Sequence, residues 1–213
     1  MVARESLTTI GDTAKSRHFR NLYHQAGSRF AQHYLKVAKR ADAKLGGEET
    51  GEGLEMLDRE LQNIRAGMEC ARNRARKEGW ELVRGYSSTL VRFFGVRGMW
   101  QEWTEWANAG LKACERLGDN QGTAQTLCNL GSACYLQGEW ERATELHEKS
   151  LEITERLGDS RGRATTWANM GVLYAKLGNP RQARELGQKA LEVFEALGSW
   201  EAQRVREWLE RLA

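Results

Sequence analysis

The side chains that could carry catalysis or hold a metal are four cysteines, four histidines and many scattered carboxylates. The cysteines include no CxxC pair, and no histidine lies at metal-ligand spacing from any of them. Each cysteine lies among apolar residues on an expected helix, which favours buried thiols in a reducing compartment over a disulfide framework. The carboxylates occur as i, i+4 partners of Lys and Arg, and no nucleophile–base arrangement is evident. The sequence therefore predicts no enzyme activity, no metal site and no cofactor. The residues considered are Cys70, Cys114, Cys128, Cys134, His18, His24, His33 and His147.

Two asparagines, Asn129 and Asn169, offer a different kind of chemistry. The amide side chain of asparagine can donate to and accept from the backbone of a bound peptide. The same amides could instead hydrogen-bond to neighbouring helices of the protein itself. Both interpretations stay open at this point.

The eight tryptophans could form an aromatic cage for a ligand. Trp100, Trp140 and Trp167 fall at positions that recur along the chain, which favours packing between helices. Trp200 and Trp208 fit no recurring position and could belong to an interface.

The elements that position these residues come from an internal repeat. Residues 120–159 and 160–199 align without a gap, and 15 of their 40 positions are identical. Residues 80–119 form a weaker third copy that keeps Gly98, Trp100 and the Leu117-Gly118-Asp119 junction in register.

Each copy predicts two helices. Apolar residues at i, i+3 and i+7 mark one helix face, and Gly131 and Gly171 lie on it. A glycine inside a helix costs about 1 kcal/mol relative to alanine, so we expect a close approach between paired backbones there. Gly98, Gly138 and Gly178 are expected to end the first helices in the left-handed conformation. In all, six further glycines are expected to end helices. These are Gly98, Gly118, Gly138, Gly158, Gly178 and Gly198; the expected N-caps are Asp119, Asp159, Asn179 and Ser199, with Pro180 and Gln182 completing a helix start.

The pattern W-x2-L-G-x2-Y followed by G, A and A resembles the tetratricopeptide-repeat (TPR) signature. The third copy matches it at Trp167, Met170, Gly171, Tyr174, Gly178, Ala183 and Ala190. The second copy has Leu127, Cys134 and Ser150 at three of these positions, and the first has Val91 and Trp103 in place of small residues. We therefore expect the first copy to pack more loosely or at another angle.

This resemblance implies an all-α fold, a right-handed superhelical α-solenoid of TPR helix-turn-helix pairs. The 40-residue unit with its L-G-D junction is similar to repeats of G-protein-signalling modulators and kinesin light chains. It is also similar to the helical arms of bacterial STAND (NB-ARC type) NTPases. The segment 57–75 resembles the region that precedes the TPR arm in those regulators. No GxxxxGK[ST] phosphate loop occurs in the sequence.

The expected organisation has six parts. Residues 1–53 form a basic N-terminal helix (17–45) and a non-helical Gly/Glu linker (46–53), and residues 54–79 form a helix that completes a degenerate N-terminal repeat. The rest comprises TPR 1 (80–119, degenerate), TPR 2 (120–159), TPR 3 (160–199) and a C-terminal capping helix (200–213), unless further repeats follow in a longer parent.

The resemblance implies a protein- or peptide-binding scaffold whose first helices line a concave groove. The alternative is the sensor or regulatory arm of a larger STAND-type signalling NTPase. The expected peptide-binding residues are Arg92, Gln125, Asn129, Ser132, Tyr135, Leu136, Thr165, Asn169, Val172 and Lys176.

Composition restricts the partners. The net charge is only +3, although residues 1–47 carry nine Lys/Arg against three Asp/Glu. A nucleic acid is an unlikely partner on this basis, because the sequence has no known nucleic-acid motif and no expected stack of exposed aromatics. No stretch is long and apolar enough for a membrane span, and residues 1–10 lack the core of a signal peptide, so we expect a cytoplasmic protein. The expected partner is another protein or peptide, with self-association through the ends of the solenoid as a further option.

Overall fold

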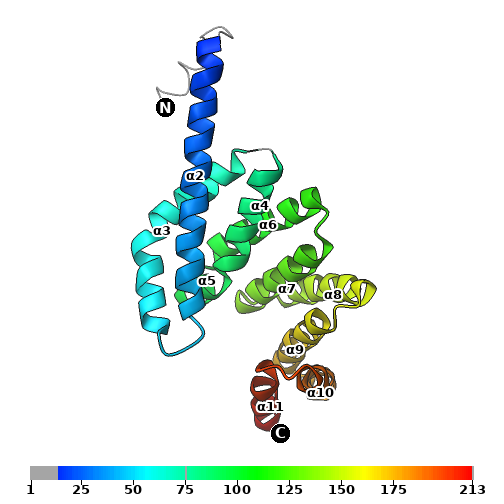
Figure 1. Ribbon diagram of the computed structural model, residues 1–213. Coiled ribbons are helices and arrows are strands. Elements are labelled where there is room, and N and C mark those ends of the chain that lie inside the picture. The colour runs from blue at the N-terminus through cyan, green and yellow to red at the C-terminus, as the bar shows by residue number, and fades with distance from the viewer. Residues whose placement is uncertain (1–13, 75, 213) are drawn as a thin grey trace. The chain divides into compact units, whose positions relative to one another are not determined.

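The computed structural model describes residues 14–74 and 76–212, and these contain ten helices and no strand (Figure 1). The predicted all-α class is confirmed. No helix in this part of the chain is long and apolar enough to cross a bilayer. The helices are α2 (Ala14–Lys44), α3 (Thr50–Arg72), α4 (Lys77–Thr89), α5 (Val91–Arg97), α6 (Trp100–Leu117), α7 (Asn120–Leu136), α8 (Trp140–Leu157), α9 (Ser160–Lys176), α10 (Pro180–Ala196) and α11 (Glu201–Arg211).

The chain divides into two compact units, residues 1–83 and 84–213. In the first unit, α2 and α3 form an antiparallel pair (Figure 1). Ala31, Leu35 and Ala38 of α2 are buried, as are Leu57 and Ile64 of α3. The apolar stripes that the sequence shows on both segments therefore meet in the core of this pair.

The prediction of a non-helical linker over 46–53 is wrong for its last four residues, because α3 already begins at Thr50. Gly53 explains the error. A Cβ atom at this position would lie 2.8 Å from the carbonyl oxygen of Ala41, so the glycine allows α3 to pack closely against α2. Lys44 also holds this start through Nζ contacts of 3.3 Å to Glu49 and 2.9 Å to Glu52.

The single helix expected over 54–79 is also wrong at its end. Helix α3 stops at Arg72, and α4 starts at Lys77. Arg74 donates from Nη1 to the carbonyl oxygen of His24 at 2.6 Å, so the connection is tied to α2. Ala75, within the helix expected over 54–79, and residues 1–13 of the predicted N-terminal segment lie outside the described residues.

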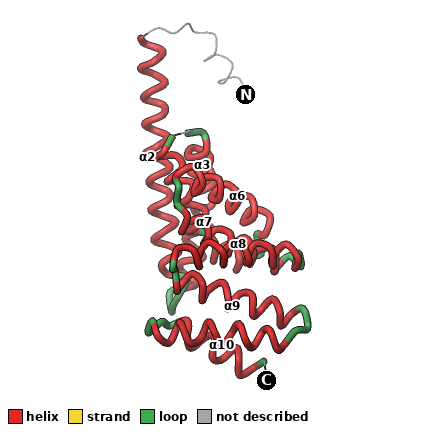
Figure 2. Tube along the Cα trace, turned by 90° about the vertical axis from the view of Figure 1, so that its right-hand side faces the viewer, coloured by secondary structure: helices red, strands yellow, loops and turns green. Residues whose placement is uncertain are grey.

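The second unit is a helical-repeat solenoid in which α7 packs on α8 and α9 packs on α10 (Figure 2). All six glycines predicted to end helices have positive φ values between 60° and 80°. Asp119 and Asp159 cap α7 and α9 by accepting from the backbone N–H of Gly122 and Gly162 at 2.8 and 2.9 Å. Helices α7 and α9 thus begin at Asn120 and Ser160, the first residues of the second and third copies.

The last two predicted helix starts differ in detail. Asn179 caps α10 as expected, but the side chain of Gln182 accepts from the Asn179 amide at 2.9 Å instead of closing a capping box on the backbone. Ser199 is not the N-cap of α11, because the helix begins at Glu201 and the Ser199 hydroxyl donates to the Glu201 carboxylate.

Gly131 and Gly171 both lie at helix contacts, but for different reasons. A Cβ atom at Gly171 would meet the backbone oxygen of Ala183 at 3.1 Å, which is the close backbone approach that the sequence predicts. At Gly131 the neighbour is the imidazole ring of His147, 2.8–2.9 Å from the same hypothetical atom. The backbone explanation is therefore wrong for Gly131, where a side chain fills the space.

The first copy differs from the others in its helices, and the looser or differently angled packing expected of it stays a prediction. Its first helix is split into α4 and α5 at Leu90, next to the Val91 that replaces the small residue. Trp103, in place of alanine, is only 4% exposed. The larger side chain at Val91 thus coincides with the break between α4 and α5, whereas Trp103 lies within the continuous helix α6.

Candidate functional site

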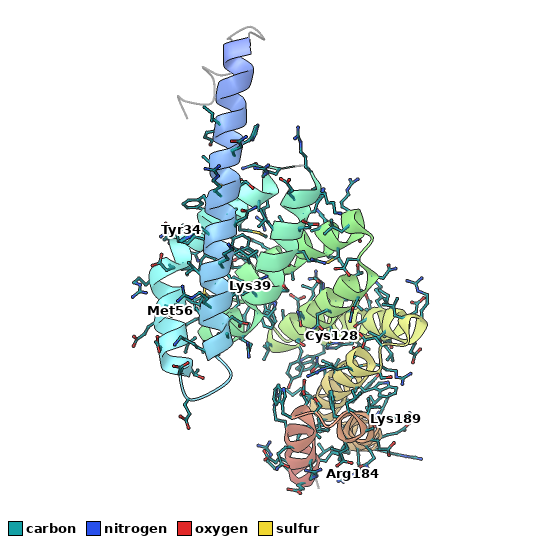
Figure 3. All side chains as sticks on the ribbon, in the orientation of Figure 1. Tyr34, Lys39, Met56, Cys128, Arg184 and Lys189 are labelled. Carbon is teal, nitrogen blue, oxygen red and sulfur yellow. The ribbon has the colours of Figure 1, made fainter. Side chains whose placement is uncertain are left out.

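The predicted binding residues of the second and third copies lie along one exposed edge of α7 and α9. Buried residues occupy the remaining faces of α7, including Leu127, Leu130 and Cys134. Cys128, labelled in Figure 3, lies next to Asn129 in the sequence but is buried with 3% exposure. The residues left accessible on this edge are Gln125, Asn129, Ser132, Tyr135 and Leu136 of α7, with Thr165, Asn169, Val172 and Lys176 of α9.

Asn129 and Asn169 have unlike environments despite their equivalent positions. The exposed side chain of Gln125 donates from Nε2 to Asn129 Oδ1 at 3.2 Å, one turn away on the same helix. Asn169 instead reaches across to α7 and donates from Nδ2 to Cys128 Sγ at 3.2 Å and to Ser132 Oγ at 3.3 Å. Asn169 therefore joins two repeats.

Hydroxyl groups beneath this edge form a second connection between repeats, which the sequence analysis missed. Ser150 of α8 donates to the carbonyl oxygen of Ala124 at 2.8 Å and lies 3.2 Å from the hydroxyl of Thr166 on α9. Both residues are buried, so these hydrogen bonds satisfy groups that would otherwise be costly to bury. Thr126 and Thr166 recur at equivalent positions, and that recurrence was the available signal.

Three of the predicted residues line a groove between α9 and α11. The groove has a volume of about 480 Å³. Its walls combine apolar and aromatic groups with charged ones. The lining residues are Thr165, Ala168, Asn169, Val172, Phe194, Trp200, Glu201, Arg204, Val205, Glu207, Trp208 and Arg211.

Trp200 and Trp208, which fitted no repeat position, both belong to this groove. Trp200 is 64% exposed, and the Arg204 guanidinium lies 5.4 Å from the centre of its ring. Trp208 packs inward: Cβ atoms built at Gly187 and Gly171 would lie 2.5 and 3.1 Å from its ring. Gly187 occupies the position held by His147 in the preceding copy, so Trp208 fills the space that the missing side chain leaves.

The charged groups of the groove are partly paired. Glu201 accepts from Arg161 Nη2 at 2.6 Å and from the Ser199 hydroxyl. Burial acts to raise the pKa of Glu201, but these hydrogen bonds outweigh it and the pKa lies below its usual value. Glu201 is therefore ionised at neutral pH and committed to Arg161. Arg204 also lines the groove, with its guanidinium over the ring of Trp200.

The other predicted residues lie outside this groove. Arg92 is exposed on α5 in the first copy, and Lys176 is exposed at the end of α9. Leu136 is 49% exposed. Ser132 donates to the carbonyl oxygen of Cys128 at 3.1 Å while it accepts from Asn169, so its hydroxyl is used within the fold.

The described residues contain no cluster of three or more His, Cys, Asp or Glu side chains that could hold a metal. All four cysteines are free thiols, and burial raises the pKa of Cys134 to about 11. A thiol with so high a pKa is a poor nucleophile at neutral pH. The arrangement of the groove suits recognition of an extended or helical chain by hydrogen bonds and aromatic contacts.

Comparisons with known proteins agree with this architecture. The family model described as tetratricopeptide repeat matches residues 96–156 and 122–196. No curated protein matches the sequence.

Three solved structures share the fold. BtubC (BKLC) from P. vanneervenii has a TM-score of 0.55 and 19% identity over 94% of this chain and 91% of its own. The apo form of RapI has a TM-score of 0.63 and 21% identity over 74% of this chain and 58% of its own. The STAND protein PH0952 from Pyrococcus horikoshii, which has a tetratricopeptide repeat sensor, has a TM-score of 0.62 and 16% identity over 85% of this chain.

The chain spans little more than half of RapI and 25% of the STAND protein. At these identities the likeness concerns the fold alone. The helix pairs, the recurring glycines and the family match together identify residues 96–196 as tetratricopeptide repeats.

Proposed function

We propose that this protein binds a peptide segment of a partner protein along the exposed edge of α7 and α9 and in the α9–α11 groove. The observation that carries the proposal is the meeting of Thr165, Asn169 and Val172 with Trp200 and Arg204 around one open groove. TPR repeats support a role in protein interaction in general. The residue assignment is specific to this chain.

The groove offers complementary contacts for a peptide. Val172 and the ring of Trp200 provide apolar surface, whereas Arg204 can donate to a carbonyl or carboxylate of the ligand. Asn169 Oδ1 remains available as an acceptor for a peptide N–H, because the two hydrogen bonds of this side chain within the fold use Nδ2. On α7, Gln125 and Asn129 would extend the contact by one repeat.

Selection from a phage-displayed random peptide library gives a test that does not depend on the identity of the partner. Peptides selected on the intact chain should bind in calorimetry at least tenfold more weakly to Val172→Glu and to Trp200→Ala. Both changes affect accessible side chains of the groove, whereas Glu148→Ala and Gln188→Ala change exposed residues of the second helices and should leave binding intact. Peptides that bind all four variants equally would refute the proposed site.

A second candidate is the sensor or regulatory arm of a larger STAND-type NTPase. The likeness to a STAND protein with a tetratricopeptide repeat sensor favours it, and 85% of this chain takes part in that match. Sequencing the gene on either side of these residues tests this candidate, because a STAND-type NTPase requires a phosphate-loop motif in the same polypeptide.

A further inference from the structure

Helix α2 presents an unusually basic surface. It carries eight Lys or Arg residues and one Asp, and residues 13–41 contain no carboxylate. The buried stripe of α2 faces α3, so the polar residues lie on the opposite side. We name this side the α2 basic face; its described residues, all exposed, are Gln25, Arg29, Gln32, His33, Lys36, Lys39 and Arg40.

The cations of the α2 basic face are not neutralised within the fold. Where the structure describes the chain, no ion pair or hydrogen bond involves the side chains of Arg29, Lys36, Lys39 or Arg40. Lys44, one turn further on, shows the contrast, because it pairs with both Glu49 and Glu52. Four like charges thus remain exposed on one helix (Lys39 is labelled in Figure 3).

Their spacing forms a line. Arg29, Lys36 and Arg40 recur at i, i+7 and i+11, which places them on one side of the helix. At 1.5 Å per residue they span about 17 Å, and Lys39 lies beside them. Such a row can contact several successive phosphates of a polyanion at once.

The composition of the face distinguishes among anionic partners. Protein interfaces have an apolar centre and few lysines, whereas nucleic-acid interfaces are polar and strongly cationic. Among the exposed residues of α2 from Gln25 to Arg40 only Ala26 is apolar, and glutamine and histidine fill the positions between the cations. Binding to a lipid surface would require an apolar helix face, but Ala31, Leu35 and Ala38 are buried against α3.

We infer that the α2 basic face binds the phosphate backbone of a nucleic acid without sequence preference, a function separate from peptide binding in the second unit. The net charge of the whole chain is only +3 because carboxylates on other elements offset the cations of α2. Guanidinium and ammonium groups would contact phosphate oxygens, and the release of counterions would provide most of the affinity.

Fluorescence anisotropy of the full chain with a labelled, mixed-sequence 24-base-pair DNA duplex tests the inference. Four neutralised phosphates predict a slope of log K against log salt of about −3.6, so binding should weaken about 150-fold between 50 and 200 mM salt. The variant Arg29→Gln/Lys36→Gln/Lys39→Gln/Arg40→Gln should lose at least tenfold affinity at 50 mM salt and most of the slope. Circular dichroism should show an unchanged fold, since all four side chains are exposed.

The matched control is Lys112→Gln/Arg116→Gln/Lys149→Gln/Arg156→Gln, which removes two lysines and two arginines that are exposed in the second unit. It should bind within about twofold of the parent, and single-stranded RNA in place of the duplex should show the same dependence on α2. Equal losses in both quadruple variants would overturn the assignment to α2. Poly-glutamate binding as tightly as the duplex, with the same salt dependence, would overturn it in favour of an acidic protein. Anionic vesicles binding while the duplex does not would overturn it in favour of a lipid surface.

Discussion

Replacing either recurring asparagine by alanine should have different effects on stability, although the two residues occupy equivalent positions in their repeats. Asn169→Ala removes donors to Cys128 Sγ and Ser132 Oγ, which lie on a different helix. Asn129→Ala removes only an acceptor for Gln125, an exposed side chain one turn away. A partly buried hydrogen bond between elements contributes about 1 kcal/mol, and the acceptors left without it add to the loss.

The predicted difference follows from these contacts. Alanine favours helix by a few tenths of a kcal/mol over asparagine, and this gain is the same at both sites. Asn169→Ala should therefore lower the free energy of unfolding by about 1–2 kcal/mol relative to Asn129→Ala. Urea unfolding followed by circular dichroism at 222 nm measures this directly. Equal midpoints, or a larger loss in Asn129→Ala, would refute the assignment of Asn169 to the junction between repeats.

Three further predictions concern the packing and capping of the repeats. Burial lowers the pKa of His147 to about 4, whereas the unfolded chain keeps a pKa of 6.5, so below pH 6.5 the unfolded state binds a proton that the folded state does not. The free energy of unfolding should therefore be highest above pH 6.5 and should fall by up to about 3 kcal/mol towards pH 4. Urea midpoints of His147→Gln should show a shallower pH dependence. Gly131→Leu and Gly171→Leu should each cost about 1–3 kcal/mol through overpacking, and thermal melts like that of the parent would contradict the contacts described at both glycines. Asp159→Ala should cost about 1 kcal/mol because the N–H of Gly162 loses its cap, and an unchanged urea midpoint would argue against that cap.

Most of the helix boundaries in the second unit could be predicted from the 40-residue period of the sequence. Gly98, Gly138 and Gly178 recur in register, and each takes the positive φ that ends a helix. The errors arose where a residue that is typical of a loop is needed instead for packing between two helices. Gly53 reads as a linker residue in the sequence, yet its missing side chain lets α3 approach α2.

The candidate site was predicted in part for a similar reason. Thr165, Asn169 and Val172 follow from the helical frame of one repeat. Trp200 and Arg204 join them only because α11 packs on α10 out of register with the preceding copies, and a period of 40 carries no information about that step. The inward orientation of Trp208 likewise depends on the absence of a side chain at Gly187, one helix away.

The central claim is that peptide binds along α9 and its groove with α11. A photo-reactive benzoylphenylalanine placed at Val172, followed by irradiation with a library-selected peptide, tests that claim directly. The reagent at Gln188, an exposed position of α10, provides the comparison. The account predicts an efficient covalent adduct from position 172 and none above background from position 188. Adducts from position 188 but not from 172 would contradict it.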